Sequence, residues 1–442
     1  MRLAIAVALA AIMALPAFAQ TAEHPAIARL RALLPAPTTL AFDSAAPLAA
    51  DPDGVRLSGV RLVRPDETLR IAELELEGLT ETGVGRAVMR GVMTQDGNDT
   101  LRIARVEIER LRHTPAPGGG RPMPLEFGLE SLVIEGLEAA GEPRVAIQRI
   151  ALRDYGAGRS GTLSLEGLTV ANIPQSPVQG MTLARFTLAG FDLAALMDAA
   201  VRQVPPPNPP AGRLSMGFQQ LLLTGPGGVA LGGAAGLLVE ADTLANMAGT
   251  MRFALRGVRV ENSPMTAQFL DALGLRQLDA SLTFEAAYEP TAGRVTMPAL
   301  ALGVQEIGAI ALGVTIDGWT PEASQRGDAA AMILRDARLR YVDEGLYARA
   351  LRAQAQQMRS TEDQVRQQHV QLLGQLLSLQ NAPPGMQQLR DALVALVRRQ
   401  ARGVEITLRP AQPVPWPQIA ATGQQGPAPL IRLLGLGAAP VR

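Results

Sequence analysis

The sequence predicts a mainly β fold with helices: a long, curved, largely antiparallel sheet of repeated strands, with a C-terminal helical hairpin packed on it. Three observations support this fold class: an alternating phrase that occurs twice, a glycine-containing hexad that recurs, and helical periodicity in the last third of the chain. Each observation indicates a different part of the architecture.

The alternating phrase is LRIAELELEGL at residues 69–79 and LRIARVEIERL at residues 101–111. Apolar and polar residues alternate in both copies, which is typical of a strand with one face in water. The alternation slips by one residue at Ala72-Glu73 and again at Glu77-Gly78, and the second copy slips at the same two places. A slip turns the following side chains to the opposite face unless a bulge absorbs it, so we expect long strands with bulges or bends.

The hexad has the pattern apolar-x-apolar-x-Gly-apolar, and a glycine late in a strand permits a bend or a bulge. We therefore expect Gly78, Gly136 and Gly167 to lie at similar depths along neighbouring strands, where each strand bends. The copies are irregularly spaced, which argues against a solenoid or propeller of fixed period. The hexad glycines are Gly59, Gly78, Gly136, Gly167, Gly190, Gly257 and Gly318.

The first residues have the form of a secretory signal peptide. Arg2 precedes an apolar run, Leu3–Leu15, and Ala17-Phe18-Ala19 places small residues at the cleavage site. The run is too short to span a bilayer. We expect residues 1–19 to be removed after Ala19 and the mature chain, beginning at Gln20, to be periplasmic.

A second charge-free segment, Leu214–Val239, contains the sequence Gly-Pro-Gly-Gly at 225–228. In a bilayer, its glycines and glutamines would disturb the helix and leave polar groups without partners. The segment therefore predicts a hairpin of strands around this turn, and we expect no transmembrane span in the mature chain.

The pattern of apolar and breaking residues divides the chain into regions. They are the signal peptide (1–19), an N-terminal β-rich region (20–204), a proline-rich linker (205–212), a second β-rich region (213–335), and a C-terminal strand, helical hairpin and closing strand (336–442). Within the β-rich regions, short helices are expected at Pro25–Leu34, at Asp192–Val204, and from Ser263-Pro264 to Leu273.

The C-terminal third changes from strand to helix periodicity. Asp343 is expected to cap the first helix, and Ser360 with Asp363 forms a capping box for the second. A third helix is expected at Met386–Arg402, after a Pro-Pro-Gly turn. The run GVEITLRP at 403–410 then predicts the closing strand.

Composition excludes several function classes. Lys+Arg and Asp+Glu are both 41, and all of the cations are arginine, so a Schiff-base lysine and a P-loop lysine are absent. Zero net charge and 3% aromatic residues do not favour nucleic-acid binding, which depends on a basic field and stacking rings. The lack of cysteine excludes disulfides, a lipid-modified N-terminus and cysteine-ligated zinc.

Histidines provide no recognisable active site. His24 and His113 lie beside a terminus and a Pro/Gly-rich loop, and His369 is on a helical stripe with Val365 and Leu372. No nucleophile or acidic partner is placed beside them, so we expect His369 to pack at the edge of a helix interface.

Carboxylates are the remaining catalytic option. Alternating glutamates lie opposite the apolar side of both phrases, which is typical of the solvated face of a sheet rather than of a carboxylate pair. They are Glu73, Glu75 and Glu77 in the first copy and Glu107 and Glu109 in the second. The run Asp96-Gly97-Asn98-Asp99 lacks the downstream glutamate of a calcium loop and predicts a hairpin turn.

The runs LRYVDEGLYARAL (339–351) and ITLRPAQPVPW (406–416), with residues 270–319, resemble a group of uncharacterised periplasmic proteins of Gram-negative bacteria. This group is similar to the wider AsmA-like envelope family. The resemblance implies a long curved sheet with an apolar groove and a role in lipid movement or outer-membrane homeostasis. It provides no catalytic residues. AsmA-like proteins usually keep an N-terminal membrane anchor, whereas this leader has a cleavage site, so the resemblance does not extend to bridging two membranes.

Two functions are compatible with these observations. The first is a non-enzymatic periplasmic cell-envelope protein that holds or shields lipid acyl chains in an apolar groove of the sheet. The second is a structural or interaction protein of the envelope, whose helical hairpin docks a protein partner without any ligand. We expect no catalytic, cofactor-binding or metal-binding residues and no cofactor, and the ligand-binding residues are unknown. A contiguous apolar sheet face left uncovered would favour the first function.

Overall fold

The computed structural model describes residues 24–442 except 35–36, 50, 65–66, 97–98, 115–122, 206–210, 245–247, 265, 321–322, 324–325, 327–328 and 378–382. The predicted signal peptide and most of the predicted proline-rich linker therefore lie outside the described residues. The chain divides into two compact units: unit 1 is Met1–Pro210 with Leu214–Ala230, and unit 2 is Ala211–Arg213 with Leu231–Arg442. The region boundaries drawn from the sequence stay predictions.

Unit 1 consists mainly of strands. They are β1 Thr39–Ala41, β2 Ser44–Leu48, β3 Asp51–Val63, β4 Thr68–Glu77, β5 Gly83–Asp96, β6 Asp99–His113, β7 Phe127–Ala140, β8 Arg144–Tyr155, β9 Ser160–Ala171, β10 Gly180–Asp192 and most of β11 Gly212–Thr224. Its described helices are α2 Pro25–Leu33 and α3 Leu193–Arg202, with the short 3-10 turns η1 Pro124–Glu126 and η2 Pro226–Gly228.

Unit 2 combines strands with a C-terminal group of helices. Its strands are β12 Ala230–Thr243, β13 Gly249–Glu261, β14 Gln277–Glu289, β15 Arg294–Val304, β16 Gly308–Asp317, β17 Ile333–Asp343, β18 Gly403–Leu408, β19 Val414–Pro415 and β20 Leu436–Val441. Its helices are α4 Ala267–Leu273, α6 Leu346–Met358, α7 Glu362–Leu376, α8 Pro384–Val397, α9 Trp416–Gln424 and α10 Pro427–Leu434, with the 3-10 turn η3 Ala329–Ala331.

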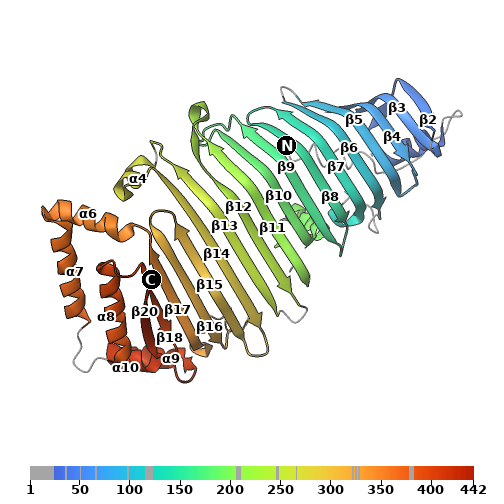
Figure 1. Cartoon of the computed structure of the whole chain (residues 1–442). Coiled ribbons are helices and arrows are strands. Elements are labelled where there is room, and N and C mark those ends of the chain that lie inside the picture. Colours follow the sequence, from blue (N-terminus) through green and yellow to red (C-terminus); the bar gives the residue numbers. More distant parts are fainter. Residues whose placement is uncertain are drawn as a thin grey trace. The chain divides into compact units, whose positions relative to one another are not determined.

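Neighbouring strands pair antiparallel within each unit (Figure 1). In unit 1 the ladder runs in chain order from β3 to β11, and both β1 and β2 pair with β3. In unit 2 it runs from β12 to β18 and ends with β20, while β19 pairs with the start of β17. The prediction of a mainly β fold with helices, built on a long antiparallel sheet of repeated strands, is confirmed.

The repeated phrase corresponds to β4 and β6, two strands of the same direction separated by β5. Both predicted slips are present: Ile71 and Leu74 are both buried, and so are Leu76 and Leu79. The sequence predicts bulges or bends at these slips. The registers from β3 to β9 contain no shift, so the strands bend without a bulge. No bulge is needed, since every strand slips at the same two levels and each strand stays aligned with its neighbours.

The two levels form rows across the sheet of unit 1, and left-handed backbone alternates between them. In the first row, the odd-numbered strands from β3 to β11 have a residue of positive φ: Gly59, Gly91, Gly136, Gly167 and Gln220. In the second row, positive φ occurs at Gly78, directly after β4, and within the even-numbered strands β6, β8 and β10 at Arg110, Asp154 and Gly190. Such residues bend a strand and increase its twist, so each row is a line along which the sheet bends.

This alternation explains and corrects the glycine prediction. Gly136 and Gly167 do share the first row, but on β7 and β9, with Gln148 of β8 between them. Gly78 is in the second row, because β4 runs opposite to β7 and β9. The glycine of the same hexad therefore lies nearer the other end of the sheet's strands. The pattern is also more complete than the glycines indicate, since Arg110, Asp154 and Gln220 occupy the glycine position of β6, β8 and β11.

The core of unit 1 combines α2 with strands β3 to β7 in one cluster of buried apolar residues. Ala26, Ile27 and Leu30 of α2 are at most 4% exposed and join the buried apolar residues of these strands. The helix begins at the predicted Pro25, where proline at the first position lacks the N–H that would be left unpaired. The predicted helix at Asp192–Val204 is α3, capped by the Asp192 carboxylate, which accepts from the Ala195 N–H.

Three predicted helix ends are wrong by a few residues. Helix α4 begins after Thr266 rather than at Ser263, and the Thr266 hydroxyl accepts from the Ser263 N–H instead. The capping box of α7 is Thr361 with Gln364, one residue beyond the predicted pair. Helix α8 stops at Val397, because Arg399 takes left-handed backbone, φ 59°, soon after it.

The prediction that β18 closes the chain is also wrong. After β18 the chain forms β19, α9 and α10, and returns as β20 to pair with β18. This stretch is rich in proline and glycine, which is typical of a loop. Prolines instead occupy the first turns of α9 and α10, and Gly435 caps α10 in left-handed backbone.

We predict that Gly136→Val destabilises the protein by about 1–3 kcal/mol, because φ is 63° there. An added Cβ would also lie 2.9 Å from the Ala104 Cβ. Gly303→Val is the matched control, since Gly303 is inside β15 and an added Cβ there meets nothing within 4 Å. Urea unfolding measures both. Equal shifts of the urea midpoint in the two variants would contradict the requirement for left-handed backbone at Gly136.

Candidate functional site

One face of the unit 1 sheet is apolar across β3 to β11. The two apolar residues of each hexad meet in the same rows, because the registers align all of these strands. We call the following three rows the unit 1 apolar face. They contain Val55, Leu76, Ala87, Ile108, Leu132, Leu152, Leu163, Leu188 and Met216; Leu57, Leu74, Met89, Val106, Ile134, Ile150, Leu165, Phe186 and Phe218; and Val60, Ile71, Val92, Ile103, Leu137, Ile147, Leu168, Leu183 and Leu221.

Burial of this face changes along the sheet. From β3 to β7 every residue of the three rows is buried, whereas from β8 to β11 every one is only half-buried. Helix α3 lies at one end of β9 and β10, where its Leu193 and Ala194 join the core. Apolar side chains on a sheet shield one another in part, so half-burial over neighbouring strands indicates a face without a complete second layer.

The sheet of unit 2 has a comparable face. Its rows contain Val239, Phe253, Phe284, Leu300, Leu312, Leu339 and Ile406; and Leu237, Leu255, Leu282, Leu302, Ile310, Tyr341 and Val404. We call these rows the unit 2 apolar face. The paired Leu302 and Ile310 are 43% and 42% exposed, whereas Val404 is 4% exposed. Burial on this face is therefore greatest at the β18 end.

Helix α8 accounts for the buried end. It packs against β18 and β20, and its Gln388 side-chain oxygen accepts the N–H of Ala438 at 3.2 Å. Strand β20 pairs with β18, so this bond satisfies a donor at the sheet edge. Helices α6 and α7 follow beside α8 (Figure 1). Of the predicted C-terminal helices, α8 thus packs on the sheet at its β18–β20 end, whereas α6 packs with α7 and α7 packs with α8.

The opposite face of unit 1 is charged, and arginines pair with glutamates of adjacent strands. Glu75, whose side chain is 10% exposed, lies 2.6 Å from Arg56 and 3.4 Å from Arg90. Glu73 lies 3.0 Å from each of the same two arginines. Burial raises the pKa of Glu75, but hydrogen bonds from Arg56 and Arg90 outweigh it, so this pKa lies below its ordinary value.

Four of the five phrase glutamates, Glu73, Glu75, Glu77 and Glu107, thus form ion pairs with arginines. Arg86 lies 3.3 Å from Glu77 and 2.7 Å from Glu107. This arginine of β5 therefore links a glutamate of the first phrase to a glutamate of the second. The expectation of a solvated face is correct for Glu77 but wrong for Glu75, which is buried between its arginines. Asp96 and Asp99 are paired at the ends of β5 and β6, which confirms the predicted hairpin.

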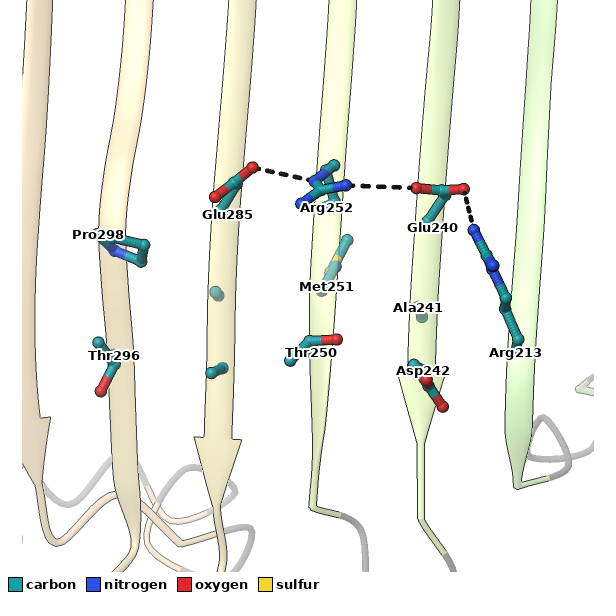
Figure 2. Close-up of a pocket in the computed structure, with 12 residues that line it drawn as sticks. Arg213, Glu240, Ala241, Asp242, Thr250, Met251, Arg252, Glu285, Thr296 and Pro298 are labelled. Atoms are coloured by element: carbon teal, nitrogen blue, oxygen red, sulfur yellow. Dashed lines mark hydrogen bonds and ion pairs between the residues drawn. The ribbon is translucent and has the colours of Figure 1, made fainter.

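The charged face of unit 2 contains a hollow of about 390 Å³. Figure 2 shows Arg213, Glu240, Arg252 and Glu285 in a line across neighbouring strands. They form consecutive ion pairs at 3.0 Å, 3.8 Å and 2.9 Å. Because these charges neutralise one another, the hollow presents no unpaired charge from them to a ligand.

Each of the three histidines has different neighbours within its own unit. The His24 side chain caps α2, and His113 lies 3.2 Å from the Glu126 carboxylate and stacks on Phe127. His369 lies between α6 and α7, with its ring nitrogens 3.1 Å from the Tyr347 hydroxyl and 2.9 Å from the Gln354 side-chain oxygen. That position agrees with the predicted helix-interface role. Among the described residues, no group of three or more His, Cys, Asp or Glu side chains is arranged to hold a metal ion.

Comparison with known proteins gives one partial match. A family model described as "Uncharacterized protein" matches residues 301–440, which run from the end of β15 through all but the last residue of β20. No curated protein matches the chain. Among the helices that the structure describes, none combines the length and the apolar character needed to cross a membrane.

We predict that Glu75→Gln destabilises the protein by about 1–3 kcal/mol at pH 7, because it weakens buried bonds to two arginines. The lowered pKa means that this stabilisation is present above the ordinary value of 4.5 and is lost as the pH falls through the folded-state pKa. The difference between variant and wild type should therefore shrink below about pH 4.

Glu166→Gln is the matched control, because its side chain is 36% exposed and pairs with one arginine, Arg185. Its effect should stay within about 0.5 kcal/mol. Urea unfolding from pH 3 to pH 8 measures both variants. A Glu75→Gln effect that is small, or independent of pH, would contradict the role of this pair.

Proposed function

We propose that the protein is a non-enzymatic periplasmic cell-envelope protein whose apolar sheet faces hold lipid acyl chains. The observation that carries this proposal is the change in burial along the unit 1 apolar face. The rows keep their apolar composition from β3 to β11, but they are buried only as far as β7. If this face simply met water from β8 onward, we would expect polar residues in these rows, as on the solvated face of other antiparallel sheets.

The chemistry of the face fits an acyl chain. The residues from β8 to β11 are aliphatic side chains, methionine and phenylalanine, without a charge in the three rows. Burying apolar surface contributes about 25 cal/mol per Å², so a long hydrocarbon chain gains most from a contiguous face of this kind. The resemblance of the C-terminal part to AsmA-like envelope proteins supports the same class of ligand.

The localisation in this proposal depends on the N-terminal sequence. Residues 1–19 have the charge, apolar run and small residues of a cleavable leader. Export to the periplasm would place the apolar faces beside the lipids of both envelope membranes. The non-enzymatic assignment is supported by four of the five phrase glutamates, which engage arginines, and by the histidines, whose partners are a helix end, Glu126 and the side chains of Tyr347 and Gln354.

A second candidate is an interaction protein that docks a partner through its helical hairpin. Leu372 and Leu376 of α7 support it, since they are 50% and 66% exposed and lie one turn apart. This function would leave the sheet faces without ligand. The two candidates therefore differ in whether lipid accompanies the protein.

We predict that acyl lipids co-purify with the exported protein and that charges on the apolar faces displace them. The test variant combines Phe186→Arg and Phe284→Arg, one on the apolar face of each unit. The matched control combines Thr187→Arg and Thr283→Arg, the next residues on the same strands, which point to the other face. Mass spectrometry of the organic extract, normalised to protein, measures the bound lipid.

The test variant should retain several-fold less lipid than the wild type, and the control should retain as much as the wild type. Both should fold, because a charge on an open face costs far less than one in a closed core. Wild-type protein without lipid would contradict the proposal and favour the interaction protein. Equal losses in the two variants would contradict a role of the apolar faces.

A further inference from the structure

The segment after β18 is basic, although the chain as a whole has no net charge. From residue 406 to residue 442, the sequence contains Arg409, Arg432 and Arg442 and no Asp or Glu. The last acidic residue, Glu405, is engaged by Arg338 at 2.5 Å. The only charged side chains of α9, α10, the loop before them and β20 are therefore arginines.

Two of these arginines lie at the same end of α10. The Arg409 N–H donates to the carbonyl of Gly435, the residue that caps this helix, at 3.2 Å. Arg432 is in the last turn of α10. Both side chains are exposed, and neither forms an ion pair among the described residues. Their charges are thus available to an external partner.

Trp416 lies at the other end of the short loop that follows Arg409. Its backbone N–H donates to the Met332 carbonyl at 2.9 Å, and the preceding β19 pairs with β17, so its position is fixed by the sheet. Helices α9 and α10 pack together at this end of β17 and β18 (Figure 1). The Trp416 side chain is 49% exposed. An indole is apolar with one polar N–H, which favours the interface between lipid and water.

We propose that Arg409, Trp416 and Arg432 form a surface that binds anionic lipid head groups. Charge complementarity selects the anionic membrane surface, and the indole enters its interfacial layer. Asp317, at the adjoining end of β16, is engaged by Arg294 at 2.7 Å and also by Arg335, so its charge is already compensated. This surface depends on the C-terminal elements alone and not on acyl chains bound by the apolar faces.

Vesicle flotation tests the proposal with the full mature chain. The probes are vesicles of phosphatidylcholine alone and vesicles in which about a third of the lipid is phosphatidylglycerol. The protein should float with the anionic vesicles at low salt, float less at high salt, and not float with the neutral ones. Arg409→Gln with Arg432→Gln should weaken the affinity by about 25-fold, since each arginine near an anionic surface contributes about fivefold.

Matched controls separate this surface from general charge and apolarity. Arg352→Gln removes an exposed arginine of α6 whose Nε donates to the carbonyl four residues earlier at 3.3 Å, as Arg432 does. Leu372→Ala removes an apolar side chain that is 50% exposed, comparable to Trp416. Both controls should float like the wild type, whereas Trp416→Ala should float less.

Tryptophan fluorescence gives a second readout. The chain has two tryptophans, so Trp319→Phe leaves Trp416 as the reporter. Its emission should shift to the blue when anionic vesicles are added and should be quenched by brominated acyl chains. Equal binding to neutral vesicles, or flotation of the Trp416 and arginine variants at the wild-type level, would overturn the proposal. A shift with soluble polyglutamate but not with anionic vesicles would also overturn it, and would assign the surface to an acidic protein.

Discussion

The structure of unit 1 depends on one constraint. Where the alternation of side chains between the two faces slips by one residue, it has to slip at the same level in every strand of the sheet. A strand that slipped alone would move its apolar residues to the charged face or lose its register. The slips at Ala72-Glu73 in β4 and at the matching place in β6 occur in one shared row, so the ladder continues without a shift. The repeated phrase is the sequence pattern that meets this constraint in strands of one direction.

The two faces of the sheet follow from the shared slips. Because apolar positions stay aligned through both rows, one face is apolar over β3 to β11, and the other collects arginines and glutamates that pair across strands. Around α2 the apolar face closes into a core, where Leu57 and Ile108 are at most 1% exposed. From β8 onward the same rows are half-buried. The chain thus repeats one strand design in two environments, and the second environment is the basis of the proposed lipid binding.

The fold class and strand positions followed from the sequence, because alternation with period two and turn residues are local signals. The sequence also revealed the slips and most of the bending residues. It did not reveal Arg110, Asp154 and Gln220 as members of the series, since left-handed backbone was inferred from glycine alone. The depth of Gly78 was wrong because strand direction, which decides to which row a hexad contributes its bend, requires pairing across the sheet. The elements after β18 were missed because prolines that begin helices resemble those of loops.

The sequence could predict that the candidate site would be an apolar sheet face, but not which part of that face is left uncovered. Apolar strand faces follow from the alternation, but their covering depends on contacts between distant segments, such as α2 against β3 and α8 against β18. The burial of Glu75 likewise depends on Arg56 and Arg90 from two neighbouring strands. The charged hollow of unit 2 and the basic C-terminal surface arise from residues brought together by the register, which no single stretch of sequence shows.

The most direct test of the account is the accessibility of the unit 1 apolar face along its rows. The chain contains no cysteine, so single cysteines at Ala87, Thr182 and Phe186 can be labelled with a maleimide in delipidated protein. The account predicts fast labelling at Phe186 of β10, comparable to the exposed Thr182 on the other face of that strand, and slowing at Phe186 when acyl lipid is added. Ala87 of β5, which is 0% exposed, should react only on unfolding. Labelling at Phe186 as slow as at Ala87 in the delipidated protein would show that the face is covered throughout and would contradict the account.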